Sequence, residues 1–344
     1  MSTDSRQLAI KNLKGSDEEL RVSWMLGNMQ QNKTFVYLSD KKNNEDKKKL
    51  LINLKDQYIK YRKQWRGNAK NAINNNLIGK KFNESNFRPL CIDIEVASVC
   101  DLACPHCYRQ FISTPDKIMS KKLAFKLIKQ ASKLKVPSMK FNWRGEPLLN
   151  PSLHEIIDYA KKKGVLETII NTNATKLDSE MSIKIINSGL DLMIYSFDGG
   201  TKKSYEKMRP GRFKKNNFDE IYNNILNFSK LKKKFNSEFP RTKIQMVLTD
   251  DTFKEQEEYF SLFKDIVDDV SVKQCTERGG KISDVGEEYL RAACSNENIE
   301  NSGNNFPIQD LDPNAEMMKD SDGNLFISKG RLPCEQPYQR MLVT

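Results

Sequence analysis

Short apolar runs alternate with longer amphipathic stretches along the middle of the chain, between residues 90 and 274. The apolar runs predict six strands, over 90–97, 138–143, 166–171, 190–197, 243–248 and 269–274. The stretches between them carry apolar residues at intervals of three and four, which predicts helices. Strands that alternate with helices over short connections predict a parallel sheet with right-handed crossovers.

Two of the predicted helices have clear boundary signals. One begins at Asn150 and Pro151, where asparagine caps the helix and proline suits the first turn, and it ends near Gly164. The next begins at Asp178, a capping residue, and ends at Gly189. Both fall between predicted strands, as a strand–helix alternation requires.

Three further helices are predicted from their apolar faces. Each face repeats at helical spacing, which is typical of a helix that packs on a sheet. The faces are formed by Leu123, Leu127, Ala131 and Leu134, by Phe218, Ile221, Ile225 and Phe228, and by Tyr259, Phe260, Phe263 and Ile266.

Six predicted strands are too few to close an eight-stranded barrel. We therefore predict an α/β protein built on a curved, partial (β/α)6 TIM-like barrel. Active sites of such barrels lie at the C-terminal edge of the strands, so residues that follow the strands are the first candidates for chemistry.

Three cysteines follow the first predicted strand within eight residues. Cys100, Cys104 and Cys107 have the spacing C-x3-C-x2-C. Thiolates are the usual protein ligands of iron–sulfur clusters, and three on one short loop can bind a 4Fe–4S cube. Because a cube has four irons, three ligands leave one iron open to another molecule. The spacing therefore favours a 4Fe–4S cluster with an open position.

Zinc is the main alternative for a cysteine-rich loop. Structural zinc is bound by four ligands, commonly arranged as two pairs. A second pair is missing here, because the chain has two histidines and its other cysteines are isolated, at Cys91, Cys275, Cys294 and Cys334. Disulfides are typical of small secreted domains rather than of a chain of 344 residues.

The cysteine loop after an apolar strand resembles the radical S-adenosylmethionine (SAM) superfamily. In that family the open iron binds the amino and carboxylate groups of SAM. The resemblance implies that an electron from the cluster cleaves SAM to methionine and a 5′-deoxyadenosyl radical, which removes a hydrogen atom from the substrate. It also implies the partial barrel, and a 4Fe–4S cluster and SAM as cofactors.

A second motif follows the second predicted strand. Gly145, Glu146 and Pro147 resemble the family's GGEP motif, with Arg144 in place of the first glycine. In the family, the backbone and the glutamate of this motif hold the SAM amino group. A glycine allows close approach of the backbone to a ligand, and a carboxylate pairs with an ammonium group. A tight turn before a helix is the alternative interpretation.

Two polar segments at the ends of the third and fourth strands extend the resemblance. Asn173 lies in a segment similar to the family's TNGT turn. Ser196 and Asp198 lie in a segment similar to its SxDG motif, whose serine commonly contacts the SAM carboxylate or ribose. Either segment alone is a common polar turn. Their order and their positions at strand ends indicate a shared cofactor site.

Two more residues match positions that contact SAM in the family. Arg209 corresponds to an arginine that pairs with the SAM carboxylate in some members. His106, directly before the last cysteine of the loop, falls where the family places an aromatic residue beside the adenine. The resemblance therefore implies cofactor-binding roles for both.

The formal net charge of +12 raises nucleic acid as a partner. The basic runs at 47–49 and 232–234 lack interleaved aromatic residues and are typical of solvated helix faces, so the sequence does not favour this partner. No stretch approaches the ~18 apolar residues of a membrane span. The first residues lack the pattern of a signal peptide. We expect a cytoplasmic protein without a membrane partner.

The composition divides the chain into three expected parts. Residues 1–85 predict a mostly helical extension, with a short helix after Ser16, a strand over 34–38 and a longer helix over 46–72. Residues 86–290 form the expected radical SAM core. Residues 291–344 predict loops and then the start of a SPASM-like auxiliary domain, because Cys334 opens a Cys-x-x-Pro-aromatic segment.

The last residues, 340–343, predict the start of a strand. A SPASM-type extension would continue into further cysteines, and none follows Cys334 in the sequence. We therefore expect no complete auxiliary cluster, and a truncated extension is preferred over a natural short form that has lost the extra clusters.

These observations together predict a radical SAM oxidoreductase, with an electron donor such as flavodoxin or ferredoxin as partner. SPASM-type relatives modify peptide or protein side chains, or oxidise sugars and aminocyclitols. A small carbohydrate-type substrate is preferred, because residues 1–85 lack the three-stranded winged-helix pattern of many peptide-modifying members. A peptide or protein maturase is the alternative. A non-catalytic zinc or RNA-binding module, or an inactive family member, is an alternative of a different class.

Overall fold

The computed structural model describes residues 57, 60, 61, 63–65, 67, 68 and 71, residues 88–274 except 114, residues 316–319 and 325–329, and residues 340–344. The helix predicted after Ser16 and the strand predicted over 34–38 lie outside these residues. The same is true of Cys275, Cys294 and Cys334.

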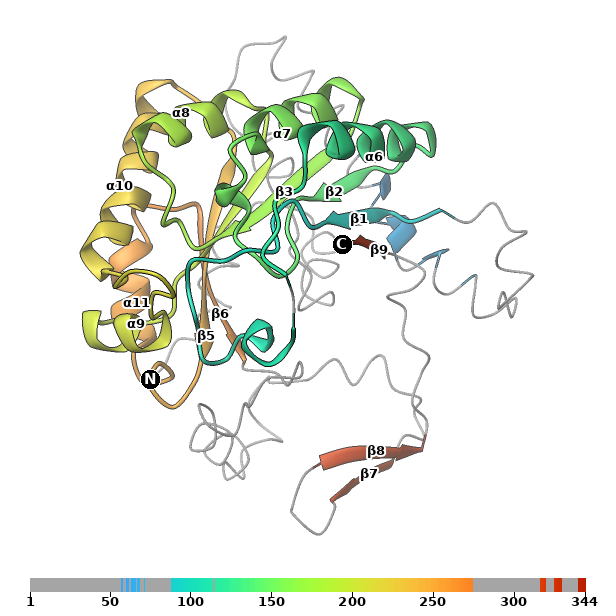
Figure 1. The fold of residues 1–344 in the computed structure, drawn as a ribbon. Helices are drawn as coiled ribbons and strands as arrows, with labels where there is room; N and C mark the ends of the chain where they lie inside the picture. The colour runs from blue at the N-terminus through green and yellow to red at the C-terminus, as the bar shows by residue number, and fades with distance from the viewer. Residues whose placement is uncertain are drawn as a thin grey trace.

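A parallel sheet forms the centre of the molecule (Figure 1). Its first six strands pair in sequence order, each parallel to the next. This confirms the predicted partial-barrel fold, although the first, second and fourth strands are shorter than predicted. The strands are β1 (Cys91–Ile94), β2 (Ser138–Lys140), β3 (Glu167–Thr172), β4 (Leu192–Ser196), β5 (Arg241–Leu248) and β6 (Asp269–Gln274).

A seventh strand, β9 (Arg340–Val343), pairs in parallel with β1 and covers its free edge. The strand predicted at the end of the sequence is therefore confirmed. The Arg340 guanidinium donates to Asp93 on β1 at 2.6 Å, which ties residues far apart in sequence across the pair. A separate antiparallel pair is formed by β7 (Glu316–Lys319) and β8 (Leu325–Lys329).

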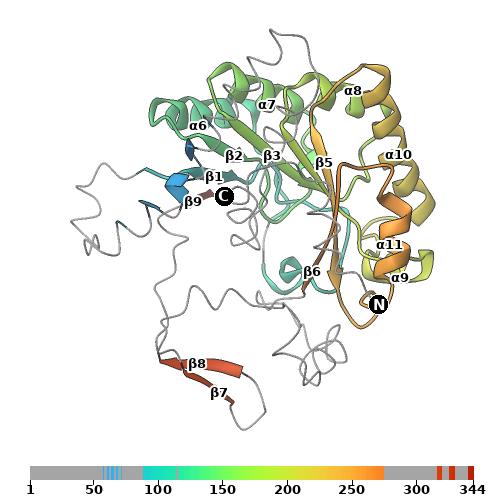
Figure 2. The same ribbon diagram turned by 180° about the vertical axis from the view of Figure 1, so that it is seen from behind.

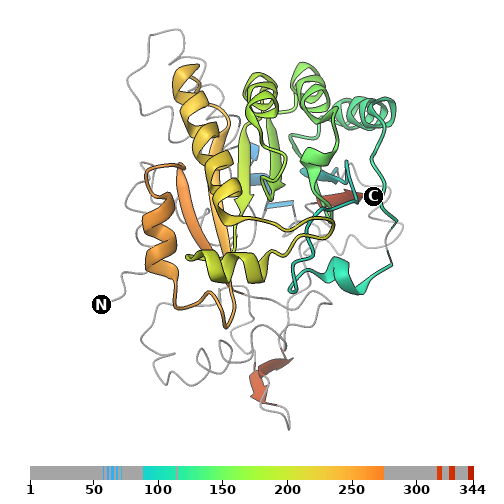
Figure 3. The ribbon, with the colours of Figure 1, turned by 60° about the vertical axis from the view of Figure 1, so that its left-hand side comes forward.

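Helices cover the outer face of the curved sheet (Figures 1, 2 and 3). Two 3-10 turns, η1 (Tyr108–Phe111) and η2 (Pro147–Leu149), follow β1 and β2. The helices between β1 and β6 are α6 (Lys121–Lys133), α7 (Leu153–Lys162), α8 (Ser179–Asn187), α9 (Lys202–Met208), α10 (Phe218–Lys234) and α11 (Gln256–Phe263). None of the helices in the described residues is long and apolar enough to cross a membrane.

The predicted helix boundaries are confirmed in one case and wrong in another. Asp178 caps α8 by accepting a hydrogen bond from the backbone of Met181 at 2.8 Å. In contrast, α7 begins at Leu153 and not after Asn150. The Asn150 side-chain oxygen does accept the backbone N–H of Ser152 at 3.0 Å, so it caps the turn that leads into α7. Its amide donates to the carbonyls of Val96 and Met119, both at 3.0 Å, and ties this turn to the sheet.

The predicted apolar face of α6 is wrong at Leu123 and Leu134, which are 46% and 53% exposed, and is confirmed at Ala131, which is buried, and at Leu127, which packs against the core. The residues that the helix buries are Ala124, Ile128 and Ala131. These three residues are spaced four and three apart, so they share one face, whereas residues one position away point about 100° from it. Residues of small and moderate size on this face let α6 approach the sheet closely.

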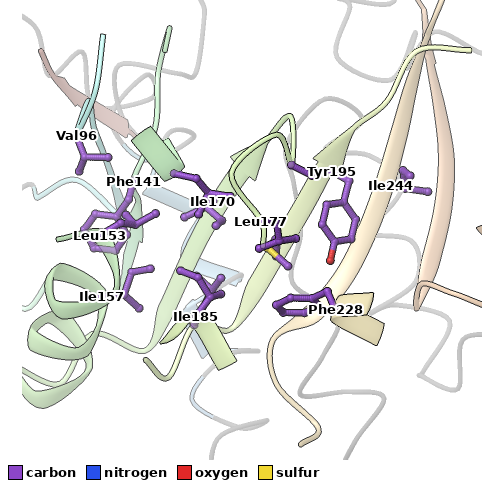
Figure 4. Packing of buried hydrophobic residues seen from close by; sticks show 14 of the residues in the cluster. Val96, Phe141, Leu153, Ile157, Ile170, Leu177, Ile185, Tyr195, Phe228 and Ile244 are labelled. Carbon is purple, nitrogen blue, oxygen red and sulfur yellow. The ribbon is translucent and has the colours of Figure 1, made fainter. Parts of the chain in front are cut away.

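The core lies between the sheet and its helices (Figure 4). Successive side chains of a strand point to opposite faces of the sheet. Every second side chain therefore points into this core, and the side chains between them point to the inner face of the barrel. Burial of each large apolar side chain stabilises the fold by about 1.5–3 kcal/mol. Core residues from the sheet side and the helix side meet here, among them Val96, Phe141, Ile170, Tyr195 and Ile244, with Leu153, Ile157, Ile185 and Phe228.

The opposite, inner face of the sheet carries polar residues beside a small buried apolar cluster of Ile169, Leu192 and Ile194. The alternation that sends Ile92 and Ile94 to the core places Asp93 and Glu95 on the inner face, and both are buried. Because the core on the helix side stabilises the sheet, the inner face can carry polar residues that bind ligands or take part in a reaction.

Candidate functional site

The cysteine loop lies at the C-terminal edge of β1, where the sequence predicted a site. Cys107 donates its backbone N–H to the carbonyl of Cys104 at 3.0 Å, which closes a turn between two of the thiols. Cys100, Cys104 and Cys107 are all free cysteines. The loop is therefore built with its three thiols available.

Burial keeps the thiols of Cys100 and Cys104 neutral in the absence of a metal. It raises the pKa of Cys100 to about 12, and the nearby Glu146 carboxylate acts in the same direction. Burial also raises the pKa of Cys104 to about 12. Because thiolates are the ligands of iron, the positive charge of a cluster must displace these protons when it binds.

The donor set of the loop suits a 4Fe–4S cluster. Its three cysteines are free and stand on one short loop, and a cube with one open iron takes three thiolate ligands. Structural zinc would need a fourth ligand.

The Gly145–Glu146 turn is pressed against the residues that lead into this loop. Glu146 donates its backbone N–H to the carbonyl of Val99 at 2.9 Å. A Cβ atom on Gly145 would approach that same carbonyl oxygen to 2.5 Å, so only glycine fits this position. The turn before Pro147, where η2 begins, is thus fixed one residue away from Cys100.

The Glu146 carboxylate is buried and held by three donors. It accepts hydrogen bonds from the Thr172 hydroxyl at 2.6 Å, from the Asn173 backbone at 2.7 Å and from the Leu148 backbone at 3.0 Å. Burial nevertheless raises the pKa of Glu146 to about 7. A cationic ligand beside this carboxylate would favour its ionised form.

Asn173 links the end of β3 to the cysteine loop. Its side-chain amide donates to the Asp101 carboxylate at 2.9 Å, and Thr175 donates to the same carboxylate at 2.6 Å. The Asn173 amide also lies 3.9 Å from the sulfur of Cys100. Asp101, next to Cys100 in sequence, therefore anchors the loop to the neighbouring strand.

Asp198, Arg209 and His106 form a second polar group beside the cysteine loop. Arg209 pairs with the fully buried Asp198 at 2.6 Å, and His106 Nε2 lies 3.4 Å from the same carboxylate. Asp198 also accepts a hydrogen bond from the backbone of Val247 at 2.7 Å. Burial lowers the pKa of His106, which favours a neutral imidazole.

Two polar atoms of this group remain available for a ligand. Arg209 Nε and His106 Nδ1 are buried, and neither has a hydrogen-bond partner among the residues described here. Buried polar atoms normally have hydrogen-bond partners. Two such atoms without partners beside the cysteine loop are therefore expected where a bound molecule supplies the missing hydrogen bonds. Ser196, half-buried at the end of β4, stands at the same edge of the sheet.

Sequence inspection missed two residues that shape the site, Glu95 and Asp101. The Glu95 carboxylate accepts two bonds from the Arg144 guanidinium, at 2.8 and 2.5 Å, and one from the Arg144 backbone at 3.1 Å. It therefore holds the start of the turn that carries Glu146. The available signals were two acidic residues, Asp93 and Glu95, in an otherwise apolar strand, and Asp101 inside the cysteine loop.

Comparison with known protein families places residues 94–263 in a match to the radical SAM superfamily. The probable GTP 3′,8-cyclase of Methanothermobacter marburgensis is 30% identical over 126 residues, which cover 36% of this chain and 41% of that protein. The mycofactocin maturase MftC of Mycolicibacterium smegmatis is 24% identical over 183 residues, which cover 53% of this chain and 44% of that protein. The chain thus spans less than half the length of these relatives.

Among solved structures, SuiB of Streptococcus suis bound to S-adenosylmethionine resembles this chain with a TM-score of 0.48 and 15% identity. The match covers 88% of this chain and 65% of that one.

Proposed function

Because this chain belongs to the radical SAM superfamily, we propose that it acts as an oxidoreductase that removes a hydrogen atom from a small carbohydrate-type metabolite. When bound, a 4Fe–4S cluster would supply the electron that cleaves SAM to a 5′-deoxyadenosyl radical. We further propose that residues 86–290 form the catalytic unit, with a helical extension before it and a SPASM-like segment after it.

Within this proposal each residue has a task that suits its chemistry. Cys100, Cys104 and Cys107 bind three irons of the cluster. Glu146 accepts hydrogen bonds from the SAM ammonium group, and Gly145 and Pro147 set the turn that holds it in place. The remaining contacts to the carboxylate, ribose and adenine of SAM come from Asn173, Ser196, Arg209 and His106, with Asp198 orienting Arg209.

The observation that carries the proposal is the direct link between Glu146 and the cysteine loop. The backbone N–H of Glu146 donates a hydrogen bond to the carbonyl of Val99, and the charge of its carboxylate raises the pKa of the Cys100 thiol. A carboxylate for the ammonium and a thiol for the iron are thus held side by side, as a molecule that bridges the two would need. The unpaired Arg209 Nε supports a carboxylate on the same ligand.

Polar residues on the inner face of the barrel support a hydroxyl-rich substrate. Alternation along the strands places Glu95, Asn142 and Asn171 on this face, together with Asp93 and Ser138. Most of these groups are bonded within the protein, but the side-chain oxygen of Asn171 is buried without a hydrogen-bond partner among the described residues, and a substrate hydroxyl would satisfy it. Peptide modification is the second candidate, because a maturase matches a larger share of this chain than the cyclase does.

Anaerobic reconstitution with iron and sulfide, followed by a dithionite-driven assay for 5′-deoxyadenosine, tests the proposal. About four irons and four sulfides per chain are expected, together with SAM cleavage. Zinc without iron or sulfide would contradict it. Pools of sugars and aminocyclitols, compared with pools of peptides, separate the two substrate classes by which pool increases 5′-deoxyadenosine formation.

A further inference from the structure

A pocket opens at the end of the sheet opposite the cysteine loop. It is lined by the turns at 135–137 and 163–166, which precede β2 and β3, together with Arg88 and described residues of 57–64, and is here called the basal pocket. Its volume of about 340 Å³ falls within the range of about 300–1,000 Å³ that is typical of small-molecule sites. Because β3 alone spans about 20 Å, the basal pocket is separate from the proposed cofactor site.

Four cations line the basal pocket. They are Lys60, Arg88, Lys135 and Lys163, and all four are exposed. Among the described residues, no carboxylate forms an ion pair with any of them. The Lys163 ammonium lies instead over the Tyr159 ring, 5.2 Å from its centre. Like charges gathered without a counter-charge create a positive potential that a bound anion would neutralise.

The nearby carboxylate does not cancel this charge. No aspartate or glutamate is among the residues that line the pocket. Glu167 lies beneath it, where its carboxylate accepts hydrogen bonds from the Ser138 hydroxyl at 2.7 Å and from the Tyr61 hydroxyl at 3.4 Å. Glu167 is buried, and one carboxylate against four cations leaves the pocket positively charged.

The rest of the lining is largely apolar. Tyr61, Val136 and Val165 are buried, and Pro137 and Leu166 are half-buried beside them. The Tyr61 ring is fixed by an edge contact with Trp65, with 5.9 Å between the ring centres. The pocket thus combines cations with a rigid apolar surface, which suits a ligand that has a charged group and a ring.

Hydrogen bonds hold two of the cations at the pocket. Ser132 accepts the backbone N–H of Lys135 at its carbonyl, at 2.9 Å, and its hydroxyl donates to the carbonyl of Lys163 at 2.8 Å. Lys135 has a left-handed backbone with a φ of 54°, which glycine or asparagine adopts more easily than lysine. Cations are also favoured after the C-termini of helices, as at α6 and α7, but this does not apply to Arg88, which precedes β1.

We propose that the basal pocket binds a small phosphorylated metabolite, with its phosphate between the cations and its ring against the apolar lining. A phosphate monoester carries about −1.5 to −2 charges at pH 7, whereas a carboxylate carries one. Arginine binds phosphate through two parallel hydrogen bonds, and lysine adds a point charge. The ligand would be bound far from the cysteine loop, so it would not be the substrate, and the inference does not depend on the proposed function.

A triple variant, Arg88→Gln, Lys135→Asn and Lys163→Gln, tests the proposal. Asparagine tolerates the left-handed backbone at position 135. The matched control is Lys122→Gln, Lys126→Gln and Lys129→Gln on α6. These three lysines are exposed and do not line the pocket. Both variants lose three positive charges, so a general charge effect would appear in both.

Anaerobic calorimetric titration of the reconstituted protein gives the Kd of each probe. The charged probes are inorganic phosphate, ribose 5-phosphate and uridine monophosphate. Ribose and uridine are the matched neutral probes. Each titration is repeated with saturating SAM, which occupies the proposed cofactor site.

The wild type should bind at least one of the two phosphate esters with a Kd below about 1 mM and neither neutral probe, and SAM should leave these values unchanged. The pocket variant should bind the ester about tenfold more weakly, and the control variant should match the wild type. Added salt should weaken ester binding by the wild type. The tighter of the two esters shows whether the pocket suits a nucleoside or a sugar.

Equal ester affinities in the pocket and control variants would overturn the proposal, as would a neutral probe that binds as tightly as its ester. Unchanged ester binding with a lower Tm in the pocket variant would show that the cations only stabilise the helix ends. If the triple variant does not fold, the single variants Arg88→Gln and Lys163→Gln should each weaken ester binding about threefold, and unchanged binding in both would refute the site. Failure of SAM cleavage in the wild type would refute the proposed function and leave this inference intact.

Discussion

The ionisation of Glu146 should control SAM affinity as pH changes. Burial raises the pKa of this carboxyl from 4.5 to about 7, against the hydrogen bonds from Thr172, Asn173 and Leu148 that favour the ionised form. The group is therefore protonated below this value and ionised above it. An ammonium group pairs with the ionised form, so SAM should bind more tightly above pH 7 than below it.

The size of this effect follows from the position of the pKa. With a value of about 7, the ionised fraction falls from about nine-tenths at pH 8 to about one-tenth at pH 6. SAM affinity should therefore fall about tenfold between these two pH values. Loss of a charge-assisted hydrogen bond costs about 1.5–3 kcal/mol, so Glu146→Gln should weaken binding by about ten- to a hundredfold at pH 8 and remove most of the pH dependence.

Equilibrium titration of SAM into the reconstituted protein, between pH 6 and 8.5, measures both effects. The control is Asp191→Asn, because burial also raises the pKa of Asp191 and its carboxylate accepts bonds from Lys161 and Thr168 at the far end of the sheet. Iron content should be equal in all three proteins. A wild-type affinity that is constant across this range, or a Glu146→Gln protein that binds SAM as tightly as the wild type, would refute the reasoning.

Three further predictions test the rest of the site. Cys104→Ala should lose the cluster and SAM cleavage, whereas Cys91→Ala should keep the full iron content, because Cys91 is buried in β1; iron analysis checks both. Gly145→Ala should weaken SAM binding and lower the Tm, because its Cβ would approach the carbonyl of residue 99 to 2.5 Å; calorimetry that shows neither change would contradict this. Asp198→Asn should cost about 3–5 kcal/mol in a urea titration, because it leaves the buried Arg209 charge unpaired, and a loss below 1 kcal/mol would count against this ion pair.

Local sequence patterns were sufficient to predict the order of elements and the location of the site. The apolar runs that became β1 to β6 were visible because strand burial repeats over short distances. The cysteines share one loop, so their spacing needs no knowledge of the fold. The turn at Gly145, the segments at Asn173 and Ser196, and the cysteine loop were placed at strand ends, and parallel strands bring such ends to one edge.

Contacts between distant residues required the tertiary structure. Which helix residues face the sheet depends on how closely the layers approach, so α6 buries Ala124 and Ile128 and leaves Leu123 exposed. The pairing of β9 with β1 joins segments that are about 250 residues apart, and no local pattern specifies that register. In both cases the local sequence explains why a helix or strand forms. Packing between distant parts of the chain decides which element it pairs with.

The same distinction holds within the site. The carboxylates of Glu95, Asp101 and Asp198 acquire their roles from Arg144, Asn173 and Arg209, which come from other loops. The sequence around a carboxylate does not predict which cation or amide will bind it. The curvature of the sheet and the register of its strands decide those pairs, because they set which side chains meet at the edge where the strands end.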